Sequence, residues 1–489
     1  MSAMMSIPNP ILSAALARPD HLALVVEGEG WSWSRLCGEV RRAAGAFAAQ
    51  GVGVGDRVAL LGEPSGAFVV ALHALGWIGA VACPLPERAP APEIGALIRR
   101  LEAVGVVLVG RLGDDLHAVE GREPARSEDP RRAAALREAR EIRAEVAAPE
   151  AAERFWPLDE VRLALMTSGT TGEPRAVSLT TGQLMTSAFG SAIRLGLSPQ
   201  DRWLSCLPLN HVGGLSILTR SAFYGTTVEL MAGFEAVEVA RALDSGRVSL
   251  VSLVPQMLEQ VLDARAAAPF AAGLRCVLLG GGPAPAALIE RCSALGVPVS
   301  VTWGMTEAAS QICTLEPGEP CGRGDVGAPL AFARVDEVEG RLRIRGPIVA
   351  GGELVTADGG EVDARGRVRV HGRADDAIVS GGENIAPGEV EAALLAHEAV
   401  ADAAVVGVPD EVWGHRPVAA LVLAPGAARP SEEALRAWCR GRLAAFKAPD
   451  RVVWVESLPR GALGKLSRSS VRAMIARQDQ SVESGSASV

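Results

Sequence analysis

Short apolar runs alternate with longer Ala/Leu-rich stretches along the first part of the chain. The runs at 22–26, 57–61 and 106–109 have the length of buried strands, and the stretches at 36–49 and 68–79 have the length of helices. Strands that alternate with helices in this way are typical of a parallel sheet covered by helices. We therefore expect a parallel α/β layer in this part of the chain.

A second alternating block extends from residue 163 to about residue 329. Its apolar runs predict further buried strands at 203–207, 227–231, 250–254, 275–279 and 299–302. After Arg334 the pattern changes to short β segments joined by glycine, for example around Gly340, which predicts a small β-rich module. Residues 1–374 are therefore expected to form one large α/β domain that includes this module.

The chain changes character again at residue 375. Helices are predicted at Pro387 and after Ser431, and strands are predicted at 403–408 and 452–455. This pattern is typical of a small α+β domain of about 100 residues, and we expect it to form a lid over residues 375–477. The Ser-rich residues 478–489 are expected to be disordered.

Length and composition narrow the class of protein. A chain of 489 residues exceeds the ~250–300 residues of one core, which agrees with two domains. The formal net charge is −9, and no basic block with interleaved aromatics occurs, so we expect no nucleic-acid partner. No apolar run reaches the ~18–20 residues of a membrane span, and the first residues lack the pattern of a signal peptide, so we expect a cytoplasmic protein.

Cysteine and histidine spacing gives no sign of a metal centre. The eight cysteines include no Cys-x-x-Cys pair, and the seven histidines include no His-Glu-x-x-His pattern. We therefore expect reduced thiols and no structural metal.

The most informative segment is 167–177, Thr-Ser-Gly-Thr-Thr-Gly-Glu-Pro-Arg-Ala-Val, directly behind the apolar run 163–166. Glycines let backbone N–H groups converge on an anion, hydroxyls add donors, and Arg175 supplies a positive charge, so the segment predicts a polyphosphate site. It is not a Walker loop, because the Gly-x-x-x-x-Gly-Lys-Ser/Thr spacing is absent here. The only Gly-Lys pair of the chain, at 464–465, is followed by leucine. Taken alone, an ordinary Ser/Thr/Gly surface turn is the alternative.

Five more segments follow in one order. They are Leu-Pro-Leu-Asn-His-Val-Gly-Gly-Leu at 207–215, Gly-Gly-Gly-Pro at 280–283, Trp-Gly-Met-Thr-Glu at 303–307, Thr-Ala-Asp at 356–358 with Gly-Arg-Ala-Asp-Asp at 372–376, and Pro-Arg-Gly-Ala-Leu-Gly-Lys at 459–465. With the phosphate loop they closely resemble the motifs of the adenylate-forming superfamily, which includes acyl-CoA synthetases, peptide-synthetase adenylation domains and luciferases. The resemblance covers about residues 22–472. It implies an acid–CoA ligase that uses ATP, Mg²⁺ and coenzyme A and forms an acyl-adenylate.

The resemblance also implies a nucleotide site. The loop would hold the β- and γ-phosphates, the glycine segment would approach adenine, an aromatic ring would cover the adenine face, and an aspartate and an arginine would contact the ribose. The residues so implied are Thr167, Ser168, Gly169, Thr170, Thr171, Gly172, Arg175, Gly281, Gly282, Pro283, Trp303, Gly304, Asp358 and Arg373.

Four positions depart from the usual motifs. Lysine and glycine are usual where this chain has Arg175 and Ala176, and tyrosine is more common at Trp303, which alone would be read as a core aromatic. Ala357 replaces a glycine, and its methyl group is tolerated if its φ is negative.

Three residues have implied roles in the chemistry. Thr306 would meet the α-phosphate, and Glu307 would bind Mg²⁺, a cation that favours carboxylate and phosphate oxygens. Lys465 would bridge the substrate carboxylate and the α-phosphate, which positions the nucleophile and neutralises charge. An unremarkable surface lysine is the alternative for Lys465.

The same family implies a lid that rotates between two half-reactions. Asp375 occupies the hinge position, although Asp375 and Asp376 together could also form a solvated turn or a carboxylate dyad. Rotation would withdraw Lys465 and bring the CoA-binding residues Gly381, Gly382 and Glu383 toward the thiol.

Local strings around 207–216, 252–258, 279–285 and 305–311 look like those of o-succinylbenzoate–CoA ligases of menaquinone synthesis. That acid carries a second carboxylate, for which Arg220, and after it Arg194, is the candidate cation. His211 would border the acyl channel and is included among the catalytic candidates, with a structural histidine as the alternative.

Other functions with the same ATP motifs stay open. They are an aryl- or medium-chain acyl-CoA synthetase, an enzyme that loads a carrier protein, a luciferase-like oxygenase, and a degenerate nucleotide binder. Small-molecule acid, ATP and CoA are the expected partners, and a homodimer or a homotetramer is the expected assembly.

Overall fold

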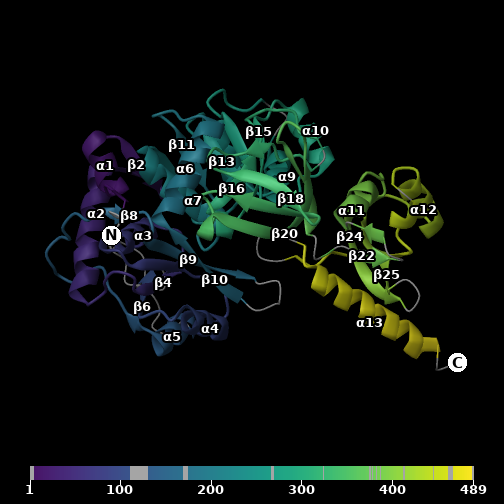
Figure 1. The fold of residues 1–489 in the computed structure, drawn as a ribbon, viewed down its shortest axis with the longest axis horizontal. Helices are drawn as coiled ribbons and strands as arrows, with labels where there is room; N and C mark the ends of the chain where they lie inside the picture. The colour runs from purple at the N-terminus through teal and green to yellow at the C-terminus, as the bar shows by residue number, and fades with distance from the viewer. Residues whose placement is uncertain are drawn as a thin grey trace.

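The protein is described by a computed structural model that covers residues 5–110, 130–168, 174–265, 269–322, 324–373, 376, 378–380, 383–385, 387–410, 414–443, 445–460 and 466–486. Figure 1 shows a large body that contains the N-terminus and a smaller body, set apart along the long axis, that contains the C-terminal elements. No helix in these ranges is long and apolar enough to cross a membrane.

A six-stranded sheet lies at the N-terminal end of the large body. Its strands, in spatial order, are β10 (Pro174–Thr180), β9 (Val161–Ser168), β5 (Val81–Pro84), β4 (Arg57–Gly62), β6 (Gly105–Val109) and β7 (Arg140–Glu141). All neighbours are parallel except β9 and β10, which form an antiparallel hairpin.

Helices cover both faces of this sheet. Successive side chains of a strand point to opposite faces, so Leu60 of β4 packs in the core of α3 (Gly66–Ile78), and Leu61 packs in the core of α4 (Ala91–Leu101). Burial on both faces explains why these strands are continuous apolar runs rather than alternating ones.

A nine-stranded sheet forms the centre of the large body. In spatial order its strands are β17 (Ala328–Pro329), β16 (Ser310–Thr314), β15 (Val299–Met305), β14 (Cys276–Leu279), β13 (Leu250–Leu253), β11 (Arg202–Ser205), β12 (Thr227–Leu230), β2 (Leu22–Val26) and β3 (Glu29–Ser32). The five strands predicted between residues 203 and 302 are all confirmed, and they pair in parallel.

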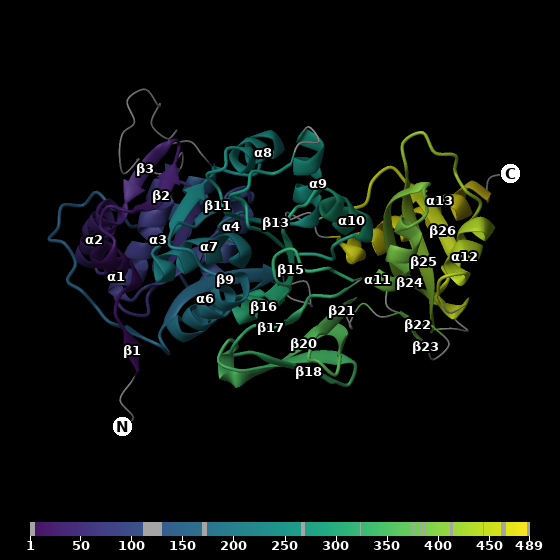
Figure 2. The same ribbon diagram turned by 90° about the horizontal axis from the view of Figure 1, so that it is seen from above.

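Helices from different parts of the chain sandwich this sheet. One face carries α1 (Pro10–Ala17), α2 (Trp33–Ala49), α6 (Thr181–Leu195) and α7 (Val212–Tyr224), whose apolar residues belong to one core. The other face carries α8 (Ala236–Asp244), α9 (Pro255–Ala264) and α10 (Ala286–Ala294). Figure 2 shows this arrangement from above.

The predicted single N-terminal layer is wrong in one respect. The strand at 22–26 exists, but β2 joins the nine-stranded sheet through β12 and does not pair with β4 or β6. Local periodicity predicts that a segment is a strand, but it does not say which partner the strand finds.

The β-rich module is an antiparallel sheet of β18 (Arg334–Val338), β19 (Arg341–Arg345), β20 (Glu353–Val362) and β21 (Val368–Arg373). The remaining elements of the large body are β1 (Ser6–Ile7), which pairs with β8 (Trp156–Pro157), and α5 (Pro130–Glu138). The predicted α/β class with an added β module is confirmed.

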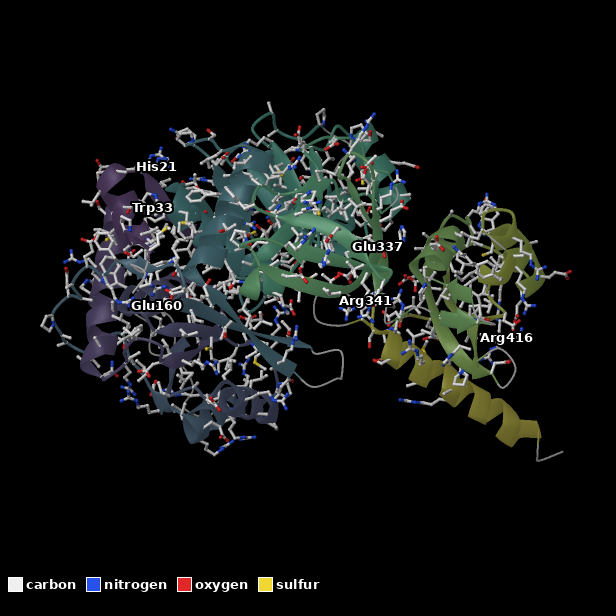
Figure 3. The ribbon with its side chains drawn as sticks, viewed as in Figure 1. His21, Trp33, Glu160, Glu337, Arg341 and Arg416 are labelled. Atoms are coloured by element: carbon white, nitrogen blue, oxygen red, sulfur yellow. The ribbon has the colours of Figure 1, made fainter. Side chains whose placement is uncertain are left out.

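The smaller body has its own sheet and core. Its strands are β22 (Ile378–Ser380), β23 (Glu383–Ile385), β24 (Val400–Asp410), β25 (Gly414–Leu423) and β26 (Arg451–Val455), and its helices are α11 (Pro387–Leu395), α12 (Glu432–Arg440) and α13 (Arg468–Ser486). The long strand β25 was not predicted. Figure 3 shows the side chains of both bodies, with Arg416 of β25 in the smaller one.

The last helix differs from the predicted disordered tail. α13 continues to Ser486 and so includes most of residues 478–489. Val471 and Ile475 are buried one helical turn apart and anchor its first turns. Once a helix is anchored, each further residue adds one backbone hydrogen bond at little cost, so a polar composition alone does not end it.

Candidate active site

The predicted phosphate loop is carried by the β9–β10 hairpin. Thr167 and Arg175 face each other in its register, and the hydroxyl of Thr167 donates to the carbonyl oxygen of Arg175 over 3.4 Å. Ser168 ends β9, and the predicted residues Gly169, Thr170, Thr171 and Gly172 lie outside the described residues. The hairpin therefore brings both flanks of the loop to one edge of the large body.

Arg175 forms an ion pair with Glu307. Its guanidinium donates to Oε1 of Glu307, 132 positions further along the chain. The Arg175 side chain is 62% exposed, so the pair lies at the surface and is screened by water. The contact places a candidate phosphate ligand next to the candidate Mg²⁺ ligand.

A tight turn presents Thr306 and Glu307. β15 ends at Met305, and the 3₁₀ turn Thr306–Ala308 leads directly into the antiparallel strand β16. The returning chain passes so close that a Cβ on Gly304 would lie 1.8 Å from the carbonyl oxygen of Ser310. Ala309 adopts a φ of +52°, and strained conformations of this kind cluster at functional sites.

Trp303, Asp358 and Arg373 come together from three strands. Nε1 of Trp303 in β15 donates to Oδ2 of Asp358 in β20 over 2.8 Å. Arg373 of β21 is the register partner of Asp358, and its Nε lies 3.9 Å from Oδ1. Ala357 is not among the residues with positive φ, so its methyl group introduces no backbone strain.

The glycine segment follows β14 at the carboxyl end of the parallel strands. A Cβ on Gly280 would lie 2.8 Å from Cγ2 of Thr302, the residue before Trp303. Gly281 has a φ of +79°, which favours glycine, and Gly281, Gly282 and Pro283 are exposed. Ligands of open α/β sheets bind outside this edge, so the segment is well placed to approach a base.

Arg220 lies inside the protein rather than on its surface. Its side chain in α7 is 1% exposed, and burial lowers the pKa of the guanidinium. One terminal nitrogen contacts Oγ of Ser187 at 3.4 Å, the ring of Trp203 lies 5.8 Å away, and Nε has no hydrogen-bond partner. Among the described residues no carboxylate pairs with Arg220.

Ser187 connects Arg220 to the tight turn. Its hydroxyl donates to the carbonyl oxygen of Ala309 over 2.8 Å, three residues after Thr306. One turn earlier on α6, Nε2 of Gln183 lies 3.3 Å from the carbonyl oxygen of Glu307. The buried cation and the catalytic motif are therefore held by the same helix.

Neither Gln183 nor Ser187 was predicted. Both are buried, and Ser191 continues the same face one turn further on. Polar residues spaced by four on the buried side of α6 are the signal that would have found them, because buried polar groups need partners.

The other two candidates for the acid site have different surroundings. His211 is the N-cap residue of α7 without a side-chain cap bond, and burial lowers the pKa of its imidazole. Arg194 donates to the carbonyl oxygen of Pro329 over 3.2 Å and lies 3.7 Å from Glu316, so it is engaged elsewhere.

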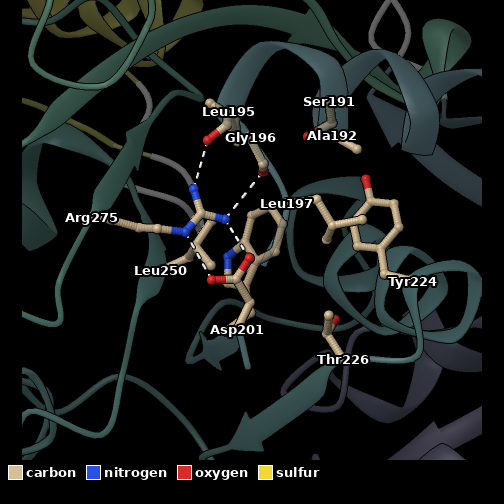
Figure 4. A pocket seen from close by; sticks show the side chains of 11 residues that line it. Ser191, Ala192, Leu195, Gly196, Leu197, Asp201, Tyr224, Thr226, Leu250 and Arg275 are labelled. Atoms are coloured by element: carbon tan, nitrogen blue, oxygen red, sulfur yellow. Dashed lines mark hydrogen bonds and ion pairs between the residues drawn. The ribbon is translucent and has the colours of Figure 1, made fainter. Parts of the chain in front are cut away.

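A shallow recess lies at the C-terminal end of α6, and its charges are already satisfied (Figure 4). Arg275 donates to the carbonyl oxygens of Leu195 and Gly196 and pairs with both oxygens of Asp201. Asp201 also accepts from the backbone N–H of Ser198 and the hydroxyl of Ser249. Arg275 and Asp201 therefore connect parts of the large body to one another and have few hydrogen-bonding groups left for a ligand.

A charge network lies next to the predicted hinge. Asp376, next to the predicted hinge residue, lies 3.5 Å from Arg468 of α13, and Arg468 binds both oxygens of Glu391 in α11 at 2.7 and 2.6 Å. Asp376 is therefore not simply a solvated turn residue.

Several predicted residues of this region are not described. Asp375, Gly381, Gly382 and Lys465 lie outside the described residues, as does the side chain of Glu383 in β23. Arg460 and Leu466, on either side of the segment that contains Lys465, form an antiparallel bridge.

Comparisons with known proteins agree with this arrangement. The model of the AMP-binding enzyme family matches residues 12–359, and that of the AMP-binding enzyme C-terminal domain matches residues 389–465. A 2-succinylbenzoate–CoA ligase of Bacillus cereus is 36% identical over 499 aligned positions, which cover 96% of this chain and 99% of that protein.

Solved structures agree as well. The o-succinylbenzoate CoA synthetase (MenE) of Bacillus subtilis in complex with the acyl-adenylate intermediate OSB-AMP is 33% identical, with a TM-score of 0.83 and coverage of 96% of this chain and 98% of that one. The same enzyme in complex with ATP and magnesium gives 33% identity, a TM-score of 0.83 and coverage of 94% and 98%. The chain therefore belongs to the AMP-binding enzyme family.

Proposed function

We propose that the protein is an ATP-dependent acid–thiol ligase that makes an acyl-CoA through an acyl-adenylate, and that its acid is o-succinylbenzoate. A carboxylate is a poor acyl donor, because its leaving group would be oxide. Attack of a carboxylate oxygen on the α-phosphorus of ATP releases pyrophosphate and gives a mixed anhydride. Attack of the CoA thiolate on the carbonyl carbon then releases AMP.

The residues around the tight turn fit the first step. Thr306 would contact the α-phosphate, the hydroxyl-rich segment after β9 would hold the outer phosphates, and Asp358 and Arg373 would bind the ribose. Lys465 would bridge the acid and the α-phosphate. Preorganised donors of this kind contribute most where charge develops in the transition state.

Glu307 fits a magnesium ligand. It offers a carboxylate in the same motif, and its only described side-chain partner is the exposed Arg175, which a bound cation can displace. Magnesium bound there would neutralise phosphate charge.

One observation carries the choice of acid. Arg220 is buried without a described carboxylate partner, and Ser187 links it to the turn that presents Thr306. An isolated buried charge is unfavourable unless a ligand pairs with it. A substrate with a second carboxylate would supply that partner, and the relatives named 2-succinylbenzoate–CoA ligases support this acid.

Pyrophosphate release measured with o-succinylbenzoate, benzoate and octanoate, with and without CoA, tests the proposal. Turnover of o-succinylbenzoate with formation of its CoA thioester is expected. Turnover of only the other two acids would remove the o-succinylbenzoate assignment, and AMP formation without any thioester would favour loading of a carrier protein. The cytoplasmic location and the assembly of two or four copies stay predictions.

A further inference from the structure

A buried hydrogen bond joins the aromatic residue of the nucleotide motif to the candidate ribose ligand. Trp303 is 8% exposed and belongs to the core between the nine-stranded sheet and α8–α10. Its Nε1 donates to Oδ2 of Asp358 over 2.8 Å. An indole N–H can only donate, so Trp303 is the donor of this bond. Close packing of the core fixes the ring and therefore the direction in which its N–H points.

The hydrogen bond restrains the carboxylate of Asp358. Its other oxygen, Oδ1, lies 3.9 Å from Nε of Arg373, beyond hydrogen-bond distance. The backbone N–H of Asp358 donates to Oγ1 of Thr356 over 3.1 Å, so the main chain is fixed too. A carboxylate held at one oxygen presents the other in a constant direction, and Oδ2 itself keeps a second lone pair.

We infer that Trp303 is a positioning residue for ribose recognition, whose indole N–H holds Asp358 in the orientation that accepts both hydroxyls of a ribose. This inference rests on the ribose role of Asp358 in the proposed function. Trp303 thereby makes the chain selective for ribonucleotides over dideoxyribonucleotides. A phenylalanine or tyrosine ring can cover an adenine face, but neither has an indole N–H to donate to Asp358.

Binding of AMP and of 2′,3′-dideoxy-AMP to the full-length protein separates this role from adenine stacking. Isothermal titration gives the affinity ratio of the two nucleotides for the unsubstituted protein, Trp303→Phe, Asp358→Ala and the double variant. Loss of stacking between the ring and adenine weakens the binding of both nucleotides alike and leaves the affinity ratio unchanged. Loss of the hydrogen bond to the carboxylate weakens only the binding of AMP, which has the hydroxyls. Its affinity should fall by about tenfold, as expected for a hydrogen bond to a charged group.

The expected result is a ratio that falls by about this factor in Trp303→Phe and falls no further when Trp303→Phe is added to Asp358→Ala. An unchanged ratio in Trp303→Phe, with a reduced ratio in Asp358→Ala, overturns the inference and leaves the proposed function intact. An unchanged ratio in Asp358→Ala removes the ribose assignment itself.

A second measurement does not need the tryptophan to be replaced. The chain has nine tryptophans, so a protein labelled with ¹⁵N at the indole nitrogens gives few signals. In Asp358→Ala one buried indole N–H is expected to lose its hydrogen-bond shift. In the unsubstituted protein the same signal should move further with AMP than with the dideoxy nucleotide, because both carry the adenine but only AMP has the hydroxyls that Asp358 accepts. If no indole signal moves in Asp358→Ala, the inference is wrong.

Discussion

Replacement of Arg220 by methionine should separate stability from activity. The side chain is 1% exposed, and its contacts include a 3.4 Å approach to Ser187 and the ring of Trp203 at 5.8 Å, while Tyr224 interacts with its charge. Burial disfavours the charged form, as its lowered pKa indicates. The apolar methionine side chain has a similar volume and removes the cost of burying a charge. The free energy of unfolding should therefore stay unchanged or rise by up to about 2 kcal/mol.

Activity should move in the opposite direction. Loss of one partner of a buried charge pair costs about 2–5 kcal/mol, and each 1.4 kcal/mol is a factor of ten. For o-succinylbenzoate, kcat/KM should therefore fall by roughly 30- to 4,000-fold in Arg220→Met. A monocarboxylic acid such as benzoate has no second carboxylate to lose, so its low turnover should change little.

Pyrophosphate release with the two acids, together with urea unfolding, measures both effects. Arg194→Met is the matched control, because this arginine is engaged with Pro329 and Glu316 and should affect neither acid differentially. A marked loss of stability in Arg220→Met, with an equal loss of activity toward both acids, would show that Arg220 is a structural cation and refute the assignment.

Three further predictions concern other positions. Lys465→Ala should abolish adenylate formation but spare thioester formation from supplied acyl-adenylate, and equal loss in separate assays of the two half-reactions contradicts its role. Arg175→Gln should lower the Mg²⁺ concentration for half-maximal ATP binding by up to about fivefold, because an exposed ion pair contributes about 1 kcal/mol or less; titration calorimetry that finds an unchanged Mg²⁺ dependence speaks against competition at Glu307. Burial lowers the pKa of His73 from 6.5 to about 4, so the unfolded chain takes up a proton first as the pH falls below 6.5, and roughly 3 kcal/mol of stability should be lost by pH 4. Urea unfolding of His73→Leu should not show this loss of stability between pH 6.5 and pH 4. A pH profile identical to that of the unsubstituted protein would exclude a contribution of His73.

The buried strands could be predicted from the sequence because burial on both faces leaves a local trace. β11 to β15 all appear as short apolar runs between helices. β25 was missed because it begins Gly-His-Arg-Pro, and glycine, charge and proline all disfavour a strand by local criteria. The partner of β2 could not be predicted, since pairing order is a property of the whole sheet.

The candidate site was predictable as a set of motifs and not as a set of contacts. Nothing in the local sequence around Arg220 distinguishes a buried arginine from one on a helix surface. The bonds from Trp303 to Asp358 and from Arg175 to Glu307 join positions that are distant in the chain, so they depend on how the sheets meet. The buried polar face of α6 did leave a periodic signal, at Gln183, Ser187 and Ser191.

The pairing of β2 with β12 has a consequence for synthesis on the ribosome. Residues 22–26 emerge early, but their partner at 227–230 emerges only after the strands β4, β5 and β6 of the other sheet have been made. Until then β2 has one edge without its backbone hydrogen-bond partners, while β4, β5 and β6 can already pair with one another. A nascent chain halted before residue 227 should accordingly expose the unpaired edge of the β2–β3 hairpin, which chaperones can bind.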